Sequence, residues 1–425
     1  MAKVTIRNVG PISNVELDLN KVNVFMGPQS SGKSTIAKVI SYCTWMEKDV
    51  ATSQSLTYYE ENRTHFRDHM ESFHKIKGYF RKDSYVSYES DVVVITWDNE
   101  QSALKWNDRY AYRRSKISYI PAERNMVILP EARKVEFGET NVRSFLFDWF
   151  DARKKYSIEN KLPILNLGAD YYYVEGNEED HIKGVYHGNE YDIFLSSASS
   201  GLQSVTPLVT MIEYLTKWIY DENSISFVQQ EKQRKVGIHL VNEEILKPYF
   251  SIDTFTSKKE REEKIEEFNT KLRENNPDAR KHLIKFRRLL DNLHKTQNSQ
   301  FIIEEPEQNL FPETQRDLVY YLLGKCLSKE GNRLTLTTHS PYVLYALNNC
   351  MMGGVVYDKM SDRDKNRLKC QSARIKPDDV SVYEIHDGTL KRIQQDDRLL
   401  GKNFFDAKMK ELMDDFYVML NYYGK

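Results

Sequence analysis

The fold of this chain is decided by residues 22–35, which read VNVFMGPQSSGKST. The apolar run from Val22 to Met26 is typical of a buried strand, and Gly27 ends it. Gly27 to Ser34 then fit the pattern GxxxxGK(S/T) without a gap, and a helix-like apolar run continues to Ile40. A strand, a glycine-rich loop and a helix in this order predict a loop that binds phosphate groups.

The residue types in this loop have defined chemical roles. Glycines let backbone N–H groups approach phosphate oxygens closely, and the start of a helix favours an anion. Lys33 would reach the β- and γ-phosphates, and Ser34 would hold Mg²⁺. A glycine turn without a ligand is the alternative. The expected contacts come from Gly27, Ser30, Ser31, Gly32, Lys33, Ser34 and Thr35.

The composition excludes several classes of protein. Hydrophobic residues make up 40% of the 425 positions and charged residues 29%, which indicates a packed core rather than a disordered chain. The 61 basic and 62 acidic residues give a net charge of -1, so any site for a polyanion must be local. No apolar run is long enough to cross a membrane, and no signal peptide is evident, so we expect a cytoplasmic protein. Free thiols are expected because no CxxC or zinc spacing joins Cys43, Cys326, Cys350 and Cys370.

Periodicity predicts the remaining elements. Period-two stretches indicate strands and longer amphipathic stretches indicate helices. The expected elements are three strands within 4–25, a polar helical stretch over 41–78, an antiparallel sheet over 84–120, a helix over 139–160, hairpin strands over 171–194, a helix over 201–220, a charged helical hairpin over 257–295, a strand and helix over 301–327, a strand and helix over 334–347, a hairpin over 380–393 and a helix over 404–423.

Two carboxylates, Glu304 and Glu305, follow the apolar run Phe301 to Ile303. In a site with a phosphate-binding loop, the first acid after such a strand binds Mg²⁺ and the next polarises the attacking water. We therefore expect Glu304 to be a metal ligand and Glu305 to be the catalytic base. Without the upstream loop, the pair would indicate only an acidic strand end.

Two further motifs follow strands. His339 would lie at the same edge of the sheet as the glutamates, where a neutral imidazole can hydrogen-bond a γ-phosphate or the attacking water. Ser199, Ser200 and Gly201 open a helix, and hydroxyl and free N–H groups there can hold a second anion. A lone histidine or a serine-rich cap is more often structural, so both interpretations depend on the order of the motifs.

In this order the motifs resemble the ABC-type ATPase heads of the RecF and SMC class, and most closely the OLD-like AAA-type ATPases of prokaryotes. The resemblance is strongest at residues 4–40 and 304–312. It implies an α/β fold: a P-loop NTPase of the ABC-ATPase head type, with a mixed sheet, an antiparallel β subdomain and helical insertions. It also implies that the nucleotide is ATP, hydrolysed at Glu305 and His339.

The resemblance further implies a homodimer that sandwiches ATP. Ser199 and Gly201, with Ser200 between them, would bind the γ-phosphate of ATP held by the opposite subunit. Residues 307–310 would run along the dimer interface, and further assembly of the dimer is left open.

The resemblance divides the chain into three parts. Residues 1–215 would form the N-terminal part of the head, with a helical insertion at about 41–78. Residues 216–297 would form a second helical insertion. Residues 298–425 would form the C-terminal part, ending in a hairpin and a helix.

The sequence departs from the family pattern in three places. Residues 119–124 occupy the expected Q-loop position without a glutamine, and Glu123 is the candidate there. Glu304 replaces the usual aspartate, and the signature lacks a full LSGGQ. We therefore expect slow hydrolysis.

Several related architectures are excluded. By resemblance, a transporter subunit would keep its signature close to the strand that carries the two glutamates. Here residues 202–300 lie between Gly201 of the signature and Phe301 of that strand. An SMC arm would need long heptad repeats between the two halves of the head, whereas the stretch 124–196 is short and not heptad-like. A Toprim nuclease would need an Asp-x-Asp pair after a hydrophobic strand; Asp362 and Asp364 instead lie in a charged stretch that we interpret as an exposed loop.

What remains is an ATPase head without its own effector. It resembles the ATPase subunits of two-gene phage-defence systems such as Septu and PARIS, or of retron-associated modules, which implies a switch that controls a separate nuclease or toxin. The alternative is a RecF-like ATPase that binds duplex DNA in repair, and a third possibility is a stand-alone hydrolytic enzyme. A charged hairpin that docks a partner is as reasonable as a DNA surface, whose candidates are Arg280, Lys281, Lys285, Arg287, Arg288 and Lys295.

Overall fold

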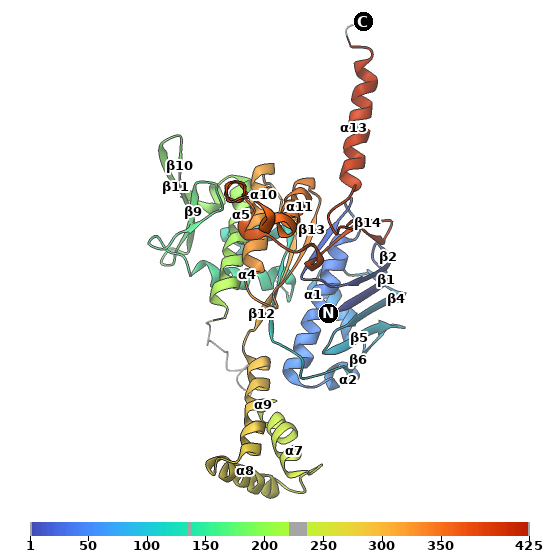
Figure 1. The fold of residues 1–425 in the computed structure, drawn as a ribbon, viewed down its shortest axis with the longest axis vertical. Helices are drawn as coiled ribbons and strands as arrows, with labels where there is room; N and C mark the ends of the chain where they lie inside the picture. Colours follow the sequence, from blue (N-terminus) through green and yellow to red (C-terminus); the bar gives the residue numbers. More distant parts are fainter. Residues whose placement is uncertain (1, 134–137, 221–235, 424–425) are drawn as a thin grey trace.

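The computed structural model describes residues 2–133, 138–220 and 236–423 (Figure 1). Its centre is an 11-stranded sheet with the order β6-β5-β4-β1-β2-β15-β14-β3-β13-β12-β7. The strands are β1 (Lys3–Val9), β2 (Ile12–Asp18), β3 (Val22–Met26), β4 (Phe80–Glu89), β5 (Val93–Asp98), β6 (Gln101–Trp106), β7 (Ser115–Ile120), β12 (Asn298–Glu304), β13 (Arg333–Thr338), β14 (Val380–His386) and β15 (Thr389–Arg392).

One half of this sheet is parallel and buried on both faces. β3 pairs with β13 and β14, and β12 pairs with β13 and β7, all in parallel. Every residue of β3 is buried, and alternate side chains enter different cores. Val24 packs with the core of α4 (Asn141–Arg153), α5 (Ser200–Glu213), α10 (Pro312–Cys326) and α11 (Pro341–Val356), whereas Phe25 packs with α1 (Lys33–Ser53) on the other face. Helices on both faces explain why these strands read as continuous apolar runs.

The other half of the sheet is antiparallel. β1 pairs with β2 and β4, and β5 pairs with β4 and β6. The prediction of one antiparallel sheet over 84–120 was wrong for β7, which pairs in parallel with β12. Period-two alternation shows that a segment is a strand, but it does not reveal the partner; here Ser115 Oγ donates a hydrogen bond to Asn298 Oδ1 at 2.7 Å and ties the start of β7 to β12.

Helical segments surround and extend the sheet. The phosphate-loop helix α1 continues to Ser53, and two shorter helices follow it, α2 (Thr57–Glu61) and α3 (His65–Phe73). A small antiparallel sheet follows α4 and is built from β8 (Leu162–Pro163), β9 (Ala169–Val174), β10 (Glu179–Tyr186) and β11 (Asn189–Phe194). The predicted helical hairpin is confirmed as α8 (Lys258–Arg273) and α9 (Pro277–His294), next to the short α7 (Lys247–Phe250). In Figure 1 these three helices extend away from the sheet.

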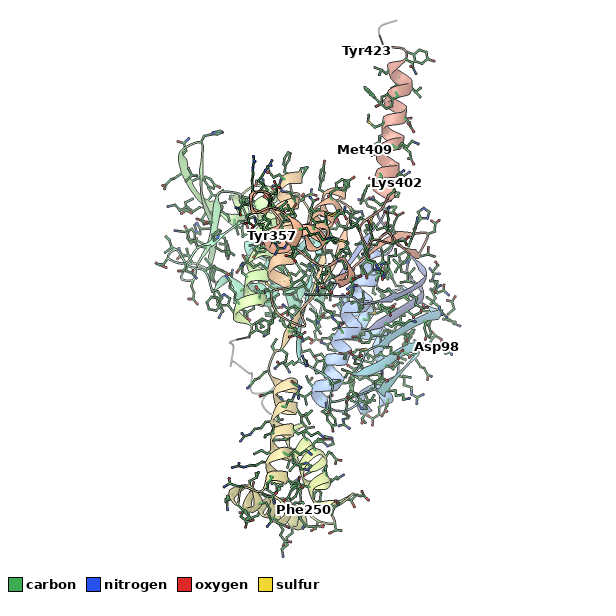
Figure 2. The ribbon with its side chains drawn as sticks, in the orientation of Figure 1. Asp98, Phe250, Tyr357, Lys402, Met409 and Tyr423 are labelled. Atoms are coloured by element: carbon green, nitrogen blue, oxygen red, sulfur yellow. The ribbon has the colours of Figure 1, made fainter. Side chains whose placement is uncertain are left out.

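The chain ends in α13 (Phe404–Leu420), which follows the short helix α12 (Asp362–Lys365) and the β14–β15 hairpin. Asn403 and Asp406 form a capping box that fixes the start of α13. No residue of α13 is buried, and the helix projects from the body past Lys402, through Met409, to Tyr423 (Figure 2). The predicted helix is therefore present. Phe404 and Phe405 in its first turn pack against the core, whereas its apolar side chains from Met409 onward are exposed.

The predicted α/β class is confirmed: the chain has a large mixed sheet with an antiparallel part, and a phosphate loop lies between a strand and a helix. Its phosphate loop joins the central parallel strand β3 to α1, and the antiparallel strands form the adjoining subdomain. The division into residues 1–215, 216–297 and 298–425 stays a prediction. Among the helices that the structure describes, none has the length and apolar character needed to cross a membrane.

Candidate nucleotide-binding and catalytic site

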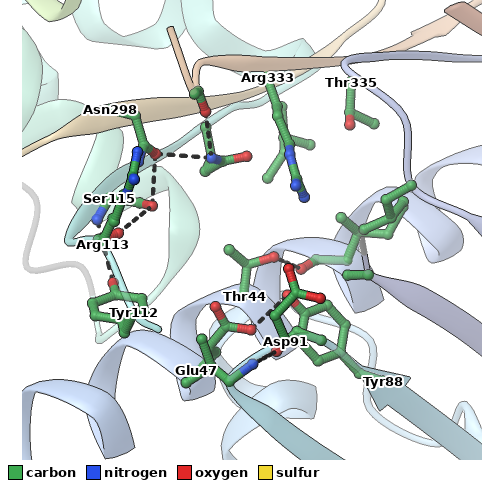
Figure 3. A pocket seen from close by; sticks show the side chains of 18 of the residues that line it. Thr44, Glu47, Tyr88, Asp91, Tyr112, Arg113, Ser115, Asn298, Arg333 and Thr335 are labelled. Carbon is green, nitrogen blue, oxygen red and sulfur yellow. Dashed lines mark hydrogen bonds between the residues drawn. The ribbon is translucent and has the colours of Figure 1, made fainter. Parts of the chain in front are cut away.

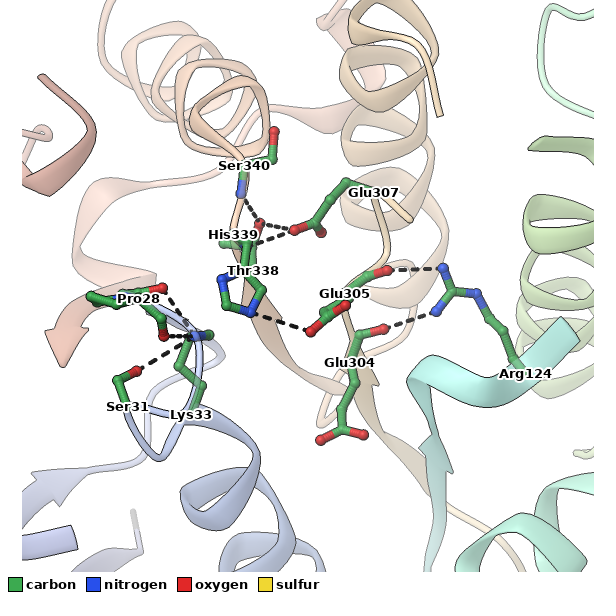
Figure 4. Close-up of polar contacts among 11 residues, drawn as sticks. Pro28, Ser31, Lys33, Arg124, Glu304, Glu305, Glu307, Thr338, His339 and Ser340 are labelled. Carbon is green, nitrogen blue, oxygen red and sulfur yellow. Dashed lines mark hydrogen bonds and ion pairs between the residues drawn. The ribbon is translucent and has the colours of Figure 1, made fainter. Parts of the chain in front are cut away.

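The parallel register brings the predicted motifs to one edge of the sheet. β3, β13 and β12 run in the same direction, so their carboxyl ends meet there. The phosphate loop follows β3, Glu305 follows β12, and His339 follows β13. Figure 4 shows the three segments facing one another.

The phosphate loop has the backbone that its glycines permit. Gly27 and Gly32 have φ angles of 149° and 105°, which L side chains rarely adopt. A Cβ at Gly27 would lie 2.6 Å from the carbonyl oxygen of Ile385, and one at Gly32 would lie 2.4 Å from Ile12 Cδ1. A larger residue at Gly27 would therefore have to displace the backbone of β14, and one at Gly32 would have to displace the Ile12 side chain and adopt a strained backbone.

Lys33 is held inside the loop. Its side chain is buried, and Nζ donates to the carbonyl oxygens of Gly27 at 2.9 Å and Pro28 at 2.6 Å (Figure 4). Burial lowers the pKa of Lys33 to about 8, and Glu305 and Glu307 oppose this shift. The ammonium group is thus held by carbonyl oxygens at the start of the loop.

A cavity of about 670 Å³ opens in front of the loop. Glu305 and His339 line it opposite the loop residues, so the structure brings these predicted residues together. Tyr79 and Arg81 also line it, and sequence reasoning missed both. They reach the cavity because Gly10 pairs with that segment: Gly10 N donates to Tyr79 O, and Arg81 Nη2 donates to Gly10 O at 3.0 Å. The cavity residues of the loop are Gln29, Ser30, Ser31, Gly32, Lys33, Ser34 and Thr35.

Glu305 and His339 form a pair. His339 Nε2 lies 3.3 Å from Glu305 Oε1, and both side chains are partly exposed to the cavity. The hydrogen bond with His339 lowers the pKa of Glu305, and Lys33 and Arg124 add to this effect against burial. Glu305 also has a φ of 43°, a left-handed conformation that a non-glycine residue adopts only when its surroundings enforce it. The carboxylate is therefore ionised and aimed by its backbone.

Glu304 lies deeper than Glu305 and does not line the cavity surface. It is buried, and its Oε1 atom has no hydrogen-bond partner among the described residues. A buried carboxylate oxygen without a hydrogen-bond partner, at the end of β12 next to Glu305, fits a Mg²⁺ ion or a water of its shell. The described residues contain no group of three or more His, Cys, Asp or Glu that could hold a metal.

Glu307 holds the backbone of His339. Its Oε1 atom accepts from His339 N at 2.6 Å and from Thr338 Oγ1 at 2.8 Å. Burial raises the pKa of Glu307 despite these two donors. Glu307 thus fixes the position of His339, a role that the resemblance did not suggest.

The signature segment does not reach this cavity. Ser199 is the N-cap of α5, and its Oγ accepts from Leu202 N at 3.4 Å. Ser199 and Ser200 are exposed, and Gly201 packs against Asn309 of the same chain. Ser199, Ser200 and Gly201 are therefore free of the P-loop cavity of their own subunit.

Arg124 is the second feature that sequence reasoning missed. It lies in η1 (Ala122–Ile128), is fully buried, and donates to the carbonyl oxygens of Glu304 and Glu305, both at 2.9 Å (Figure 4). Burial lowers its pKa to about 10, and nearby Glu307, Glu305 and Glu304 oppose that shift. Glu123, the sequence candidate for this segment, is exposed. The sequence held one pointer to this role, because Arg124 directly follows Glu123 in the segment at the Q-loop position.

The predicted basic face of α9 is partly neutralised. Lys285 Nζ pairs with Glu244 at 2.8 Å, and Lys295 Nζ pairs with Asp291 at 2.9 Å. Lys281, Arg287 and Arg288 remain exposed. The surface open to phosphates is therefore smaller than the sequence suggested.

A second cavity, of about 430 Å³, lies at the amino ends of β12 and β13 (Figure 3). It is lined by Glu47 of α1, by Arg333 and by Tyr88, whose hydroxyl donates to Glu47 Oε2 at 2.9 Å. Burial raises the pKa of Glu47, and Tyr88, Ser90 and Arg333 oppose the shift.

Because the pKa of Glu47 is raised, its contribution to the free energy of unfolding depends on pH. The folded state holds the Glu47 proton more tightly than the unfolded chain does, so stability from this group is full below about pH 4.3 and falls as pH rises through the folded pKa. We expect Glu47→Gln to match the wild type in urea unfolding at pH 4 and to unfold at higher urea at pH 8. Glu16→Gln is the control: Lys3 lowers the pKa of Glu16, so that variant should gain nothing at pH 8. Equal midpoints for Glu47→Gln and wild type at both pH values would contradict the expectation.

Comparisons with known proteins give distant similarities. No protein-family model matches the chain, and no curated protein matches it. Among solved structures, the SMC head domain from Thermotoga maritima is 10% identical, with a TM-score of 0.36, over 92% of this chain and 97% of that chain. The Smc head domain from Pyrococcus furiosus bound to the C-terminal domain of ScpA is 9% identical, with a TM-score of 0.36, over 97% and 99%. The recombination mediator protein RecF is 9% identical, with a TM-score of 0.27, over 92% and 97%.

Proposed function

We propose that this chain is a Mg²⁺-dependent ABC-type ATPase that acts as a nucleotide-driven switch for a separate effector, a nuclease or toxin, in prokaryotic anti-phage defence. The observation that supports the ATPase is the pairing of Glu305 with His339 across one cavity from Lys33 and the phosphate loop. These groups are what phosphoryl transfer to water needs: a phosphate cradle, a cation and a positioned base. The OLD-like character and the defence role rest on the resemblance of the sequence motifs.

The residues divide the work as follows. The N–H groups of the loop and Lys33 would bind the β- and γ-phosphates, and Ser34 and Glu304 would hold Mg²⁺. Mg²⁺ held there would supply positive charge that stabilises the phosphate oxygens during transfer. Glu305 accepts the proton of the attacking water at its carboxylate, and His339 orients that carboxylate through the 3.3 Å contact.

The proposal includes a homodimer. Ser199, Ser200 and Gly201 are remote from the cavity of their own subunit but stand at the start of a helix, where N–H groups favour an anion. Two heads that face each other would let the signature of each cap the nucleotide of the other. Closure on ATP and separation after hydrolysis would then be the switch.

Control of a separate protein is supported by α13. The helix exposes a row of apolar side chains, with Leu412 68% and Phe416 52% exposed, and nothing in the described chain covers them. Contiguous exposed apolar surface is typical of protein interaction sites. A helix of this kind is consistent with a head that passes its nucleotide state to another protein.

The experiment that tests this function is the ATP hydrolysis rate of the purified protein with and without duplex DNA, with Lys33→Ala as the blank. A hydrolysis rate above that of Lys33→Ala that does not change when duplex DNA is added favours the partner-gated switch. In that case the product of the neighbouring gene should change the rate. Hydrolysis that stays at the blank with DNA and with that gene product would contradict the ATPase assignment.

A RecF-like DNA-binding ATPase is the second candidate. Lys281, Arg287 and Arg288 are exposed on α9 and could contact phosphates. If it is correct, duplex DNA should stimulate ATP hydrolysis, and the double variant Lys281→Glu, Arg288→Glu should lose this stimulation. The ion pairs of Lys285 and Lys295 with acidic residues argue for the first candidate.

A further inference from the structure

Arg124 joins two segments that are remote in sequence. On one side its guanidinium donates to the carbonyl oxygens of Glu304, Glu305 and Pro306, at 2.9, 2.9 and 3.3 Å. On the other side it donates to Ser204, to the carbonyl oxygen at 3.1 Å and to Oγ at 3.2 Å. One fully buried side chain thus bonds the catalytic turn and α5 at the same time.

The first segment is the turn that aims the catalytic base. Its backbone is left-handed at Glu305, and Glu305 N donates to Thr337 O at 2.9 Å. A strained conformation persists only where surrounding bonds determine it. The three bonds from Arg124 to consecutive carbonyl oxygens are part of that determination, so the orientation of the Glu305 carboxylate depends on the position of the guanidinium.

The second segment is the helix that carries the signature. Ser204 lies one turn after Ser200 in α5, which begins at the signature residues. The guanidinium is planar and its donors keep a fixed geometry, so a displacement of α5 at Ser204 displaces the bonds to the catalytic turn as well. No flexible linker lies between the two sets of bonds.

We propose that Arg124 is a positioning residue that couples the two nucleotide sites of the dimer. This inference rests on the proposed function. Each signature caps the nucleotide of the opposite subunit, whereas each Glu305 acts on the nucleotide of its own subunit. Closure of α5 on the partner's ATP therefore changes the geometry of Glu305 at the other site, and the coupling is reciprocal in binding free energy.

The coupling predicts a specific kinetic signature. Wild-type hydrolysis depends sigmoidally on ATP concentration, with a Hill coefficient above unity. Arg124→Lys keeps the charge but cannot make the forked contact, so we expect the Hill coefficient to fall to unity and kcat to fall at least about tenfold, on the scale of a misplaced catalytic group. Binding of a fluorescent ATP analogue to each head should stay within about twofold, because the phosphate loop is untouched.

A milder variant keeps the test decisive if Arg124→Lys does not fold. Ser204→Ala removes only the bond at Oγ and leaves the carbonyl contact, so it should lower the Hill coefficient while kcat changes less than about threefold. Ser328→Ala removes a serine hydroxyl that donates to Lys325 O within its own turn and takes no part in the Arg124 contacts, so it should behave as wild type.

The outcomes separate the two proposals. Sigmoidal wild-type kinetics that Arg124→Lys or Ser204→Ala makes hyperbolic support the coupling. Active wild type with hyperbolic kinetics, or a folded variant with unchanged Hill coefficient, overturns the coupling and leaves the ATPase in place. A wild type no more active than Lys33→Ala overturns the ATPase itself.

Discussion

Replacement of Lys33 by alanine is expected to abolish tight binding of ATP. Nζ is fixed at the carbonyl oxygens of Gly27 and Pro28, so the variant loses the cation that faces the β- and γ-phosphates. Loss of one partner of a buried charged contact costs roughly 3 kcal/mol, which corresponds to about 100-fold in affinity. Isothermal titration with Mg-ATP measures this change.

The fold should survive this substitution. Burial disfavours the charged form of Lys33, as its lowered pKa of about 8 shows, so removal of the ammonium takes away an unfavourable desolvation. Thermal unfolding of the nucleotide-free variant should match or exceed that of the wild type. Lys38→Ala, on the same helix but outside the cavity, is the matched control and should bind ATP normally. Unchanged ATP affinity in Lys33→Ala would place the nucleotide elsewhere.

The second large effect is expected for Glu305→Gln. The glutamine keeps the shape of the side chain and can still accept from His339, but it cannot take a proton from water. A positioned general base contributes about 10²–10⁴-fold, so hydrolysis should fall within that range while ATP still binds. Because the nucleotide then persists in the closed state, sedimentation in Mg-ATP should show an accumulated dimer.

The environment of Glu305 makes this a clean test. The hydrogen bond with His339 lowers its pKa, so the carboxylate is ionised at neutral pH and the wild-type rate near pH 7 is not limited by its protonation. Glu313→Gln is the matched control, since Glu313 is exposed and pairs with Arg316 outside the cavity. Native hydrolysis by Glu305→Gln would show that another group is the base.

The candidate site was accessible from sequence where its parts are local. The phosphate loop needs only a strand, a glycine spacing and a helix within residues 22–35, and backbone conformation at Gly27 and Gly32 follows from residue type. Glu305 and His339 were predictable at the same edge because each follows an apolar run, and parallel strands end together. Their roles remain proposals.

Other parts of the site depend on contacts between distant segments. Arg124 bonds Glu304 across 180 positions, and no local pattern marks an arginine as fully buried. Tyr79 and Arg81 reach the cavity only because that segment pairs with Gly10. The same limit explains β7, whose alternating residues showed a strand but not its parallel partner.

The sequence by itself determined the phosphate loop, the acidic strand end and the α/β order of the elements, because short-range spacing and hydrophobic periodicity encode them. Only the tertiary structure decided which residues share the cavity, why Glu305 holds a left-handed backbone, and that α13 leaves its apolar face uncovered. The physical reason is that packing and buried hydrogen bonds depend on which distant segments meet. The hydrogen bonds of Arg124 to Glu305 and Ser204, which join the catalytic turn to α5, are an example.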